Sequence, residues 1–498
     1  MSRPRIAILS LILCMAALVR FHGLADQGFF MSDEAAFALE ADKLARSVDM
    51  AVRRVPGEGG PFEGTVRPFH MILLALMPDT TSVLYFSALC GVLTVAFVAL
   101  LARGMADAPD SLAPELAALL LATSPSHVFF SRMLAPEASA ICLMCAALVV
   151  YLADRGNSIK RLAASGFIFG LAYGLQPRMT FPALFFIAAE FAARRDARRI
   201  LILCSFLALP LVVMEGLYSI LGWAHRSMGS TYYPHGYLAQ YINMEGIARM
   251  VPRLNRIEFM FDYLRKVESL PYYILFFIAL LAAALRRKYV ALGVGLCALF
   301  IFLAGTIGDQ VLFSGKRWGR MLQPGIVLGC ALVGSFLADR ARGSFSQKLA
   351  AIALVLLAIG LRAEILAESI VMKSDAERVM KEAYRRAPSP TMFSEDDNLL
   401  TWHLRGLPPH IGFYPGLDTA TVIIFDREYA SQFGFLHLLP DTPTFLLEDN
   451  TMKPRILYLE TFGRAVDLER FASIPPRPAQ VYVLPKHYQR PDRPRSAR

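Results

Sequence analysis

The chain contains 498 residues, of which 55% are hydrophobic and 18% charged, and it carries a formal net charge of +10. Ordinary soluble domains contain about 25% charged residues, so this composition argues against a soluble enzyme and against a disordered chain. Most of the basic residues lie in short clusters at the ends of apolar runs. That placement is typical of membrane proteins and argues against nucleic-acid binding.

Apolar runs recur through the first three quarters of the sequence, and runs of about 18 residues are typical of membrane-spanning helices. The pattern predicts a polytopic all-α membrane protein with about 11 transmembrane helices. The run at 68–77 is too short to cross a bilayer, so we expect an interfacial or re-entrant segment there. The predicted helices cover residues 6–21, 81–102, 112–130, 138–153, 162–177, 180–193, 200–221, 271–285, 289–306, 321–338 and 349–365.

The basic clusters fall at alternate ends of these helices, which places them all on one side of the membrane. Because cytoplasmic loops carry an excess of Lys and Arg, this side is predicted to be the cytoplasm. The first run is expected to be a retained helix rather than a cleaved signal peptide. The N-terminus then lies in the cytoplasm and the C-terminus outside it, and we expect a multi-pass protein of the bacterial inner membrane.

The sequence predicts two domains. Residues 1–366 form the transmembrane domain, with large external loops at 22–80 and 222–270. Residues 367–498 are more polar and richer in proline, with strand-like runs such as Thr421–Phe425 and Arg455–Leu459. We expect them to form a small external α/β domain with a frayed C-terminal tail.

Several common kinds of site are missing from the sequence. All seven cysteines lie in apolar runs, which argues against a disulfide framework and against a Cys/His zinc site. The sequence contains no phosphate-binding loop of the G-x-x-x-x-G-K-[ST] type and no H-E-x-x-H motif. A phosphate-bearing substrate would therefore be lipid-linked and approached from the membrane.

Charges on the predicted external side break the orientation pattern, and charges at such positions are often functional. The first are Asp33 and Glu34, in the loop after the first helix. They can simply favour the start of a helix that Ser32 caps. A carboxylate fixed at the membrane surface can also act as a general base toward a hydroxyl group.

The other exceptions are mostly basic. Arg67 precedes Pro68 at the start of the short apolar segment, and Arg178 lies in a predicted external turn. Arg132 and Glu137 lie five residues apart and can pair with each other or contact a substrate. The cluster Lys316-Arg317-Trp318-Gly319-Arg320 can anchor the chain at the interface or bind a phosphate group.

In this order, the short motifs resemble those of the GT-C superfamily of membrane glycosyltransferases. The likeness is greatest to its branch of protein O-mannosyltransferases and lipid A aminoarabinose transferases. It extends over about residues 1–335 and rests on motifs that recur in a shared order. These are Asp33-Glu34, Arg67-Pro68, Ser131-Arg132 with Glu137, Gly170 and Gly174 before Arg178, and Arg317-Trp318 before Pro324.

This resemblance implies an inverting glycosyltransferase that moves a sugar from a polyprenyl-phosphate donor to an acceptor hydroxyl on the external face. It implies that Asp33 is the general base and that Glu34 orients Asp33 or the sugar. The residues implied to bind the carrier phosphate or the sugar are Arg67, Arg132, Glu137, Arg178, Lys316, Arg317 and Arg320. The implied process is the glycosylation of an envelope glycan, a glycolipid or a protein.

The sequence requires no cofactor. The first external loop contains no Asp-x-Asp motif, so no metal site is predicted, although a divalent metal remains an open alternative. The expected partners are the lipid-linked donor, a lipid, glycan or protein acceptor, and membrane lipids.

Two other functions also remain open: a flippase for lipid-linked sugars, and a non-catalytic protein of envelope assembly. A flippase would need a polar path through the bilayer, whereas the charges here collect on one face.

Overall fold

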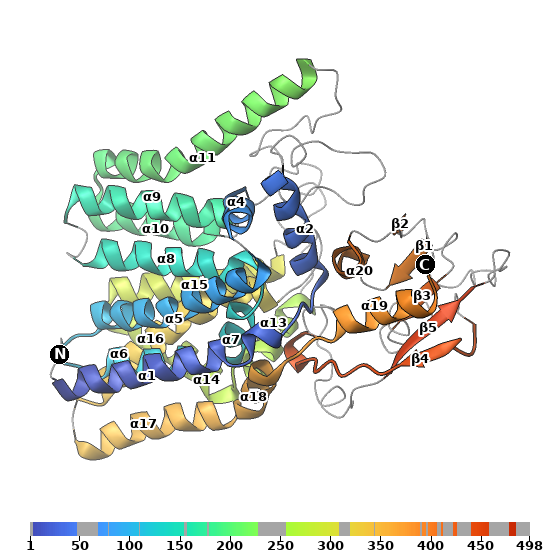
Figure 1. The fold of residues 1–498 in the computed structure, drawn as a ribbon. Coiled ribbons are helices and arrows are strands. Elements are labelled where there is room, and N and C mark those ends of the chain that lie inside the picture. The colour runs from blue at the N-terminus through green and yellow to red at the C-terminus, as the bar shows by residue number, and fades with distance from the viewer. Residues whose placement is uncertain are drawn as a thin grey trace.

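The computed structural model is mainly helical, and a small mixed sheet lies at one end of the helical bundle (Figure 1). The N-terminus lies at the opposite end of the bundle. The structure describes residues 3–46, 68–77, 79–108, 110–153, 157–176, 179–227, 255–307, 319–342, 344–388, 391–394, 397–405, 410–411, 422–425, 440–457 and 478–484.

Helices occupy all eleven of the apolar runs that predict membrane spans. Their bounds are α1 (Arg3–Phe21), α5 (Thr80–Met105), α6 (Ala113–Ala122) with α7 (Pro125–Ser131), α8 (Pro136–Leu152), α9 (Ile159–Leu175), α10 (Thr180–Arg194), α11 (Ala197–Ser227), α14 (Leu270–Leu285), α15 (Tyr289–Ile307), α16 (Gln323–Arg340) and α17 (Phe345–Gly360). The run at 112–130 is divided because Ser124 caps α7 and Pro125 opens it.

Three of the described helical segments are long and apolar enough to cross a membrane: Arg3–Asp26, Thr80–Met105 and Ala197–Gly216. The count rises to five if the bent pairs α7–α8 and α17–α18 (Ala363–Val371) are each taken as one span. Four shorter apolar helices lie among them. The protein is therefore a helical membrane protein with several apolar helices, and the count of about 11 spans stays a prediction.

Helix α16 lies at the centre of the bundle, where it packs against α5, α6, α14 and α15. Its core-facing positions include Gly325, Gly329 and Gly334. A Cβ atom at Gly334 would come within 2.6 Å of Ala117 on α6, so these two helices approach each other closely. A second group of helices, α8, α9 and α11, packs beside α5.

Two short helices cover the end of the bundle that lies nearest the sheet. They are α2 (Ser32–Arg46), which follows the 3-10 turn η1 (Leu24–Asp26), and α4 (Pro68–Leu76). The predicted short apolar segment at 68–77 therefore forms a helix. A third helix at this end, α13 (Asn255–Lys266), lies in the predicted loop 222–270.

The C-terminal part contains α19 (Ala376–Arg386), α20 (Asp397–His403) and a five-stranded sheet of order β2-β1-β3-β5-β4. β1 pairs in parallel with β2 and β3, whereas β5 runs antiparallel to β3 and β4. An α/β content is thus present, and the external location stays a prediction. The strands are β1 (Thr391–Ser394), β2 (His410–Ile411), β3 (Val422–Phe425), β4 (Phe445–Leu447) and β5 (Ala479–Val483).

The two strand-like runs in this part have different outcomes. β3 confirms the run at Thr421–Phe425. The run at Arg455–Leu459 was wrongly expected to be a strand, because residues 455–457 form a helical turn. Ion pairs explain the difference: the Arg455 guanidinium pairs with Glu364 and Glu368 on α18, and the Arg455 N–H donates to Glu368. The predicted domain boundary at 366 falls within α18 and stays a prediction.

Candidate functional site

An ion pair joins two distant parts of the sequence at the end of the bundle nearest the sheet. A carboxylate oxygen of Asp33, on the first turn of α2, lies 2.5 Å from Nη2 of Arg320. Arg320 belongs to the 3-10 turn η5 (Gly319–Leu322) that leads into α16. The Arg320 side chain is 2% exposed, whereas the Asp33 side chain is 21% exposed. Asp33 is therefore a carboxylate that a substrate can reach and that a buried cation holds in place.

Glu34 fixes the first turn of α2 through backbone hydrogen bonds. Its carboxylate accepts the N–H groups of Phe30 (2.8 Å) and Met31 (3.1 Å) before the helix, and of Leu134 (2.9 Å) in the segment between α7 and α8. Burial raises the pKa of Glu34 to about 7, although these donors favour the charged form. Glu34 thus joins the start of α2 to the helical bundle and sets the position of Asp33.

The C-terminal part packs against α2 and the segment that precedes it. Phe29 lies 5.9 Å from the Trp402 ring and 6.4 Å from the His403 ring of α20, measured between ring centroids. The Ser374 N–H donates to the Gln27 carbonyl (2.7 Å). One hydrophobic core joins residues of α2 and α4 to residues of α19, α20 and the sheet. The helix that carries Asp33 is therefore held between the bundle and the C-terminal part.

Arg132 lies at the C-terminal end of α7 and is fully buried. Its Nη1 donates to the carbonyls of Val19 (3.1 Å), Arg20 (3.1 Å) and His22 (2.8 Å) at the end of α1. Terminal carbonyls of a helix lack partners within the helix, so Arg132 caps α1. Its predicted contact with a substrate stays a prediction.

Glu137 lies on the first turn of α8 and is 2% exposed. It accepts a hydrogen bond of 2.8 Å from Nε2 of Gln176, at the end of α9. The glycines of α9 serve close packing here, since a Cβ atom at Gly174 would come within 1.9 Å of the Phe69 ring on α4. This arrangement joins α4, α8 and α9 at the same end of the bundle as Asp33.

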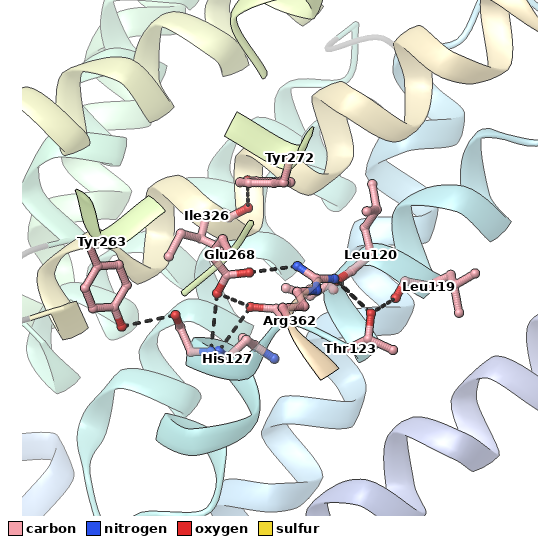
Figure 2. A network of polar contacts seen from close by, with 12 residues as sticks. Leu119, Leu120, Thr123, His127, Tyr263, Glu268, Tyr272, Ile326 and Arg362 are labelled. Carbon is pink, nitrogen blue, oxygen red and sulfur yellow. Dashed lines mark hydrogen bonds and ion pairs between the residues drawn. The ribbon is translucent and has the colours of Figure 1, made fainter. Parts of the chain in front are cut away.

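A buried polar network that the sequence did not predict lies where three junctions between successive helices meet: α6–α7, α13–α14 and α17–α18 (Figure 2). Nη1 of Arg362, between α17 and α18, lies 2.8 Å from a carboxylate oxygen of Glu268, and both side chains are fully buried. Glu268 also accepts hydrogen bonds from the Ser124 hydroxyl (2.7 Å) and the Ser126 N–H (3.3 Å). Arg362 donates to Thr123 Oγ1 (2.8 Å). The ion pair therefore satisfies polar groups that the break between α6 and α7 leaves without helical partners.

The sequence offered one signal for this network. Ser124-Pro125 inside a predicted span is a helix start, which a continuous helix would not contain. Glu268 gave no comparable signal, because it lies beside a predicted span like an ordinary loop charge. Arg362 lies inside the predicted span 349–365, but so near its end that it looks like an ordinary helix-end charge.

Four predicted phosphate or sugar contacts lie outside the described residues, and their roles stay predictions: Arg67, Arg178, Lys316 and Arg317. Within the described ranges, no group of three or more His, Cys, Asp or Glu side chains could hold a metal ion. The question of a metal therefore stays open as predicted.

Comparison with known proteins gives a partial family match and extensive structural matches. The family model for dolichyl-phosphate-mannose-protein mannosyltransferases matches residues 69–217. No curated protein matches the sequence.

Three solved structures resemble most of the chain. ArnT from Cupriavidus metallidurans in the apo state has 16% sequence identity and a TM-score of 0.56, and the match covers 88% of this chain and 96% of ArnT. ArnT bound to undecaprenyl phosphate has 15% identity and a TM-score of 0.56, with coverages of 85% and 94%. The apo oligosaccharyltransferase of Archaeoglobus fulgidus has 12% identity and a TM-score of 0.60, with coverages of 87% and 71%.

At these identities the structural matches show the fold alone. All of these matched proteins are glycosyltransferases of the GT-C superfamily. The chain therefore has the GT-C fold, and the resemblance that its spaced motifs predict is confirmed.

Proposed function

We propose that this protein is an inverting glycosyltransferase that moves a sugar from a polyprenyl-phosphate carrier to an acceptor hydroxyl on the external face of the membrane. The observation that carries the proposal is the pair of Asp33 with Arg320 at one end of a GT-C fold. A carboxylate that is 21% exposed can meet an acceptor, and a buried guanidinium can meet a phosphate. The binding of undecaprenyl phosphate by ArnT supports this class of donor.

In the proposed reaction, the acceptor hydroxyl attacks the anomeric carbon of the donor and its proton passes to Asp33. The bond between the anomeric carbon and the phosphate oxygen breaks, and polyprenyl phosphate leaves with the electron pair. Arg320 stabilises the negative charge of the leaving phosphate. A single displacement from the face opposite the phosphate inverts the anomeric carbon.

The pairing of Asp33 with Arg320 suggests an order of events. A carboxylate held 2.5 Å from a guanidinium is a weak base, because the positive charge stabilises its ionised form. The donor phosphate is a diester that carries one negative charge, like the carboxylate, and its oxygens compete with Asp33 for the Arg320 guanidinium. The leaving polyprenyl phosphate gains a second negative charge, which strengthens its contact with Arg320. Donor binding would then release Asp33 as the base at the point where the acceptor needs it.

The other predicted residues have proposed roles of two kinds. Arg132 and Glu137 act indirectly, by holding α1, α8 and α9 around the site through the hydrogen bonds described above. Arg67, Arg178, Lys316 and Arg317 are proposed to bind the carrier phosphate together with Arg320. Glu34 is a positioning residue for Asp33.

A transfer assay tests the proposal. Purified protein in liposomes is given a panel of polyprenyl-phosphate sugars with a labelled sugar, together with candidate lipid, glycan and peptide acceptors. We expect wild type to release or transfer the sugar of at least one donor, and Asp33→Asn to lose this activity.

Asp79→Asn is the matched control, because Asp79 lies in the same predicted external loop and caps α5. Asn caps a helix as well as Asp, so this variant should keep wild-type activity. Labelled lipid that crosses the bilayer without turnover of any donor would contradict the proposal and favour a flippase.

A further inference from the structure

Gln323 is a buried amide that lies close in the sequence to Arg320 of the Asp33–Arg320 pair. It is the first residue of α16, three residues after Arg320, and its side chain is fully buried. Neither Oε1 nor Nε2 of Gln323 has a hydrogen-bond partner among the described residues. Leaving a buried amide unpaired is unfavourable for folding, so stability alone does not account for glutamine at this position.

The backbone places Gln323 on the same face as Arg320. The 3-10 turn η5 covers Gly319–Leu322 and runs directly into α16. In a 3-10 helix, residues i and i+3 are eclipsed and lie about 6 Å apart along the axis. Gln323 therefore lies one turn below Arg320, farther from the end of the bundle.

The position of Gln323 at the start of α16 favours a side chain that extends back toward the preceding turn. In a helix, Cα–Cβ bonds tilt toward the N-terminus, so a long side chain covers the turn before its own Cα atom. For Gln323 this turn is η5, which carries Arg320 and packs against α7 and α15. Its neighbours along the chain, Leu322 (2% exposed) and Ile326 (fully buried), are buried as well.

We propose that the Gln323 amide binds a hydroxyl group of the sugar that the protein transfers. An amide offers both an N–H donor and a carbonyl acceptor, and a sugar hydroxyl needs both. A phosphate group has mainly acceptors, which the Gln323 carbonyl would repel and which Arg320 already serves. The inference rests on the proposed glycosyltransferase function and assigns the contact of Gln323 to the sugar rather than to the lipid phosphate.

The test compares wild type with Gln323→Met, a replacement of similar volume that removes both polar groups. The probes are undecaprenyl phosphate alone, undecaprenyl-phosphate mannose and undecaprenyl-phosphate glucose. For the sugar-bearing donor that wild type turns over, we expect Kd and KM to rise about tenfold in Gln323→Met, the loss of about one hydrogen bond. The Kd for undecaprenyl phosphate alone should stay within about twofold.

Thermal stability gives a second, independent readout. Because an unpaired buried amide destabilises the donor-free protein, Gln323→Met should raise its Tm or leave it unchanged. Gln323→Asn keeps an amide, but its side chain is shorter by one methylene group. The Kd of this variant for the sugar-bearing donor should therefore also rise. Gln347→Met, on the exposed face of α17, is the control and should change neither readout.

Two results would overturn the inference while leaving the proposed function intact. One is an equal loss of affinity for undecaprenyl phosphate and for the sugar-bearing donor. The other is an unchanged Kd for both probes in Gln323→Met. Failure of wild type to turn over any donor would instead contradict the proposed function itself.

Discussion

Loss of one partner from the buried pair of Glu268 and Arg362 should destabilise the protein strongly (Figure 2). Arg362→Met removes the cation and leaves the Glu268 carboxylate fully buried. Its remaining partners are the Ser124 hydroxyl and the Ser126 N–H. Breaking a buried pair by removing one partner costs about 3–5 kcal/mol.

This cost can be converted into a thermal shift. Unfolding entropy is about 2.1 cal/mol/K per residue, or about 1 kcal/mol/K for a chain of 498 residues. The Tm of Arg362→Met should therefore fall by about 3–5 °C. The double variant Glu268→Gln/Arg362→Met contains no uncompensated charge and should recover most of this loss.

The assay is thermal unfolding of the purified protein in detergent, followed by fluorescence. Arg385→Met is the matched control, because Arg385 lies 2.8 Å from Glu382, the same distance as the buried pair, but its side chain is 76% exposed. This control should show no measurable change. The reasoning is wrong if Arg362→Met behaves like Arg385→Met, or if the double variant is as unstable as the single one.

Three further predictions concern the surroundings of the site. The pKa of Glu34 is raised from 4.5 to about 7, so the folded protein holds this proton more tightly than the unfolded chain does. The stability gained from the proton is fully present below about pH 4.5 and is lost as the pH rises through 7. Wild-type Tm should therefore fall more between about pH 5 and pH 8 than the Tm of Glu34→Gln, and parallel curves would contradict this. Trp402→Ala removes the ring that packs against Phe29 and should lower kcat by about tenfold at unchanged donor KM. Trp402→Phe keeps an aromatic ring and should keep most of the activity. A change in KM alone would argue against a role of this contact in positioning Asp33. Gly174→Ala should lower the free energy of unfolding by about 1–3 kcal/mol, because its Cβ atom would overlap the Phe69 ring. The control Gly104→Ala, whose Cβ atom would have its nearest neighbour at 3.6 Å, should be neutral or stabilising. Equal Tm values for the two variants would refute the argument.

The helical elements could be predicted because apolar length is a local property of the sequence. Each of the eleven runs contains a helix, and the short run at 68–77 forms α4. The break at Ser124-Pro125 was missed because the apolar run continues through it. The helical turn at 455–457 was missed because its cause, the ion pairs of Arg455 with α18, is a contact between distant residues.

The candidate site could be predicted only in part. The sequence singled out Asp33 and Arg320 separately, as charges on the side of the membrane where charges are unexpected. Their direct pairing depends on how α2 and η5 meet and could not be read from the sequence. The same holds for Glu34, whose three backbone donors come from two separate segments.

The role of the C-terminal part depends on tertiary packing as well. Its composition indicated a separate polar domain, yet its helices α19 and α20 share a hydrophobic core with α2 and α4. Individual apolar residues such as Leu399 and Leu400 are buried in this core, and nothing in their local pattern says which partner they meet. The position of Asp33 is therefore expected to depend on both parts of the chain.

The central claim is that Asp33 is the base of a sugar transfer from a lipid phosphate and that Arg320 meets that phosphate. The most direct test measures two quantities on Asp33→Asn: the single-turnover rate at saturating donor, and the Kd for undecaprenyl phosphate. We predict a rate at least about 10² lower than wild type, with a Kd that is unchanged or lower because Arg320 is no longer held by a carboxylate. Asp33→Asn that transfers sugar at the wild-type rate would contradict the account.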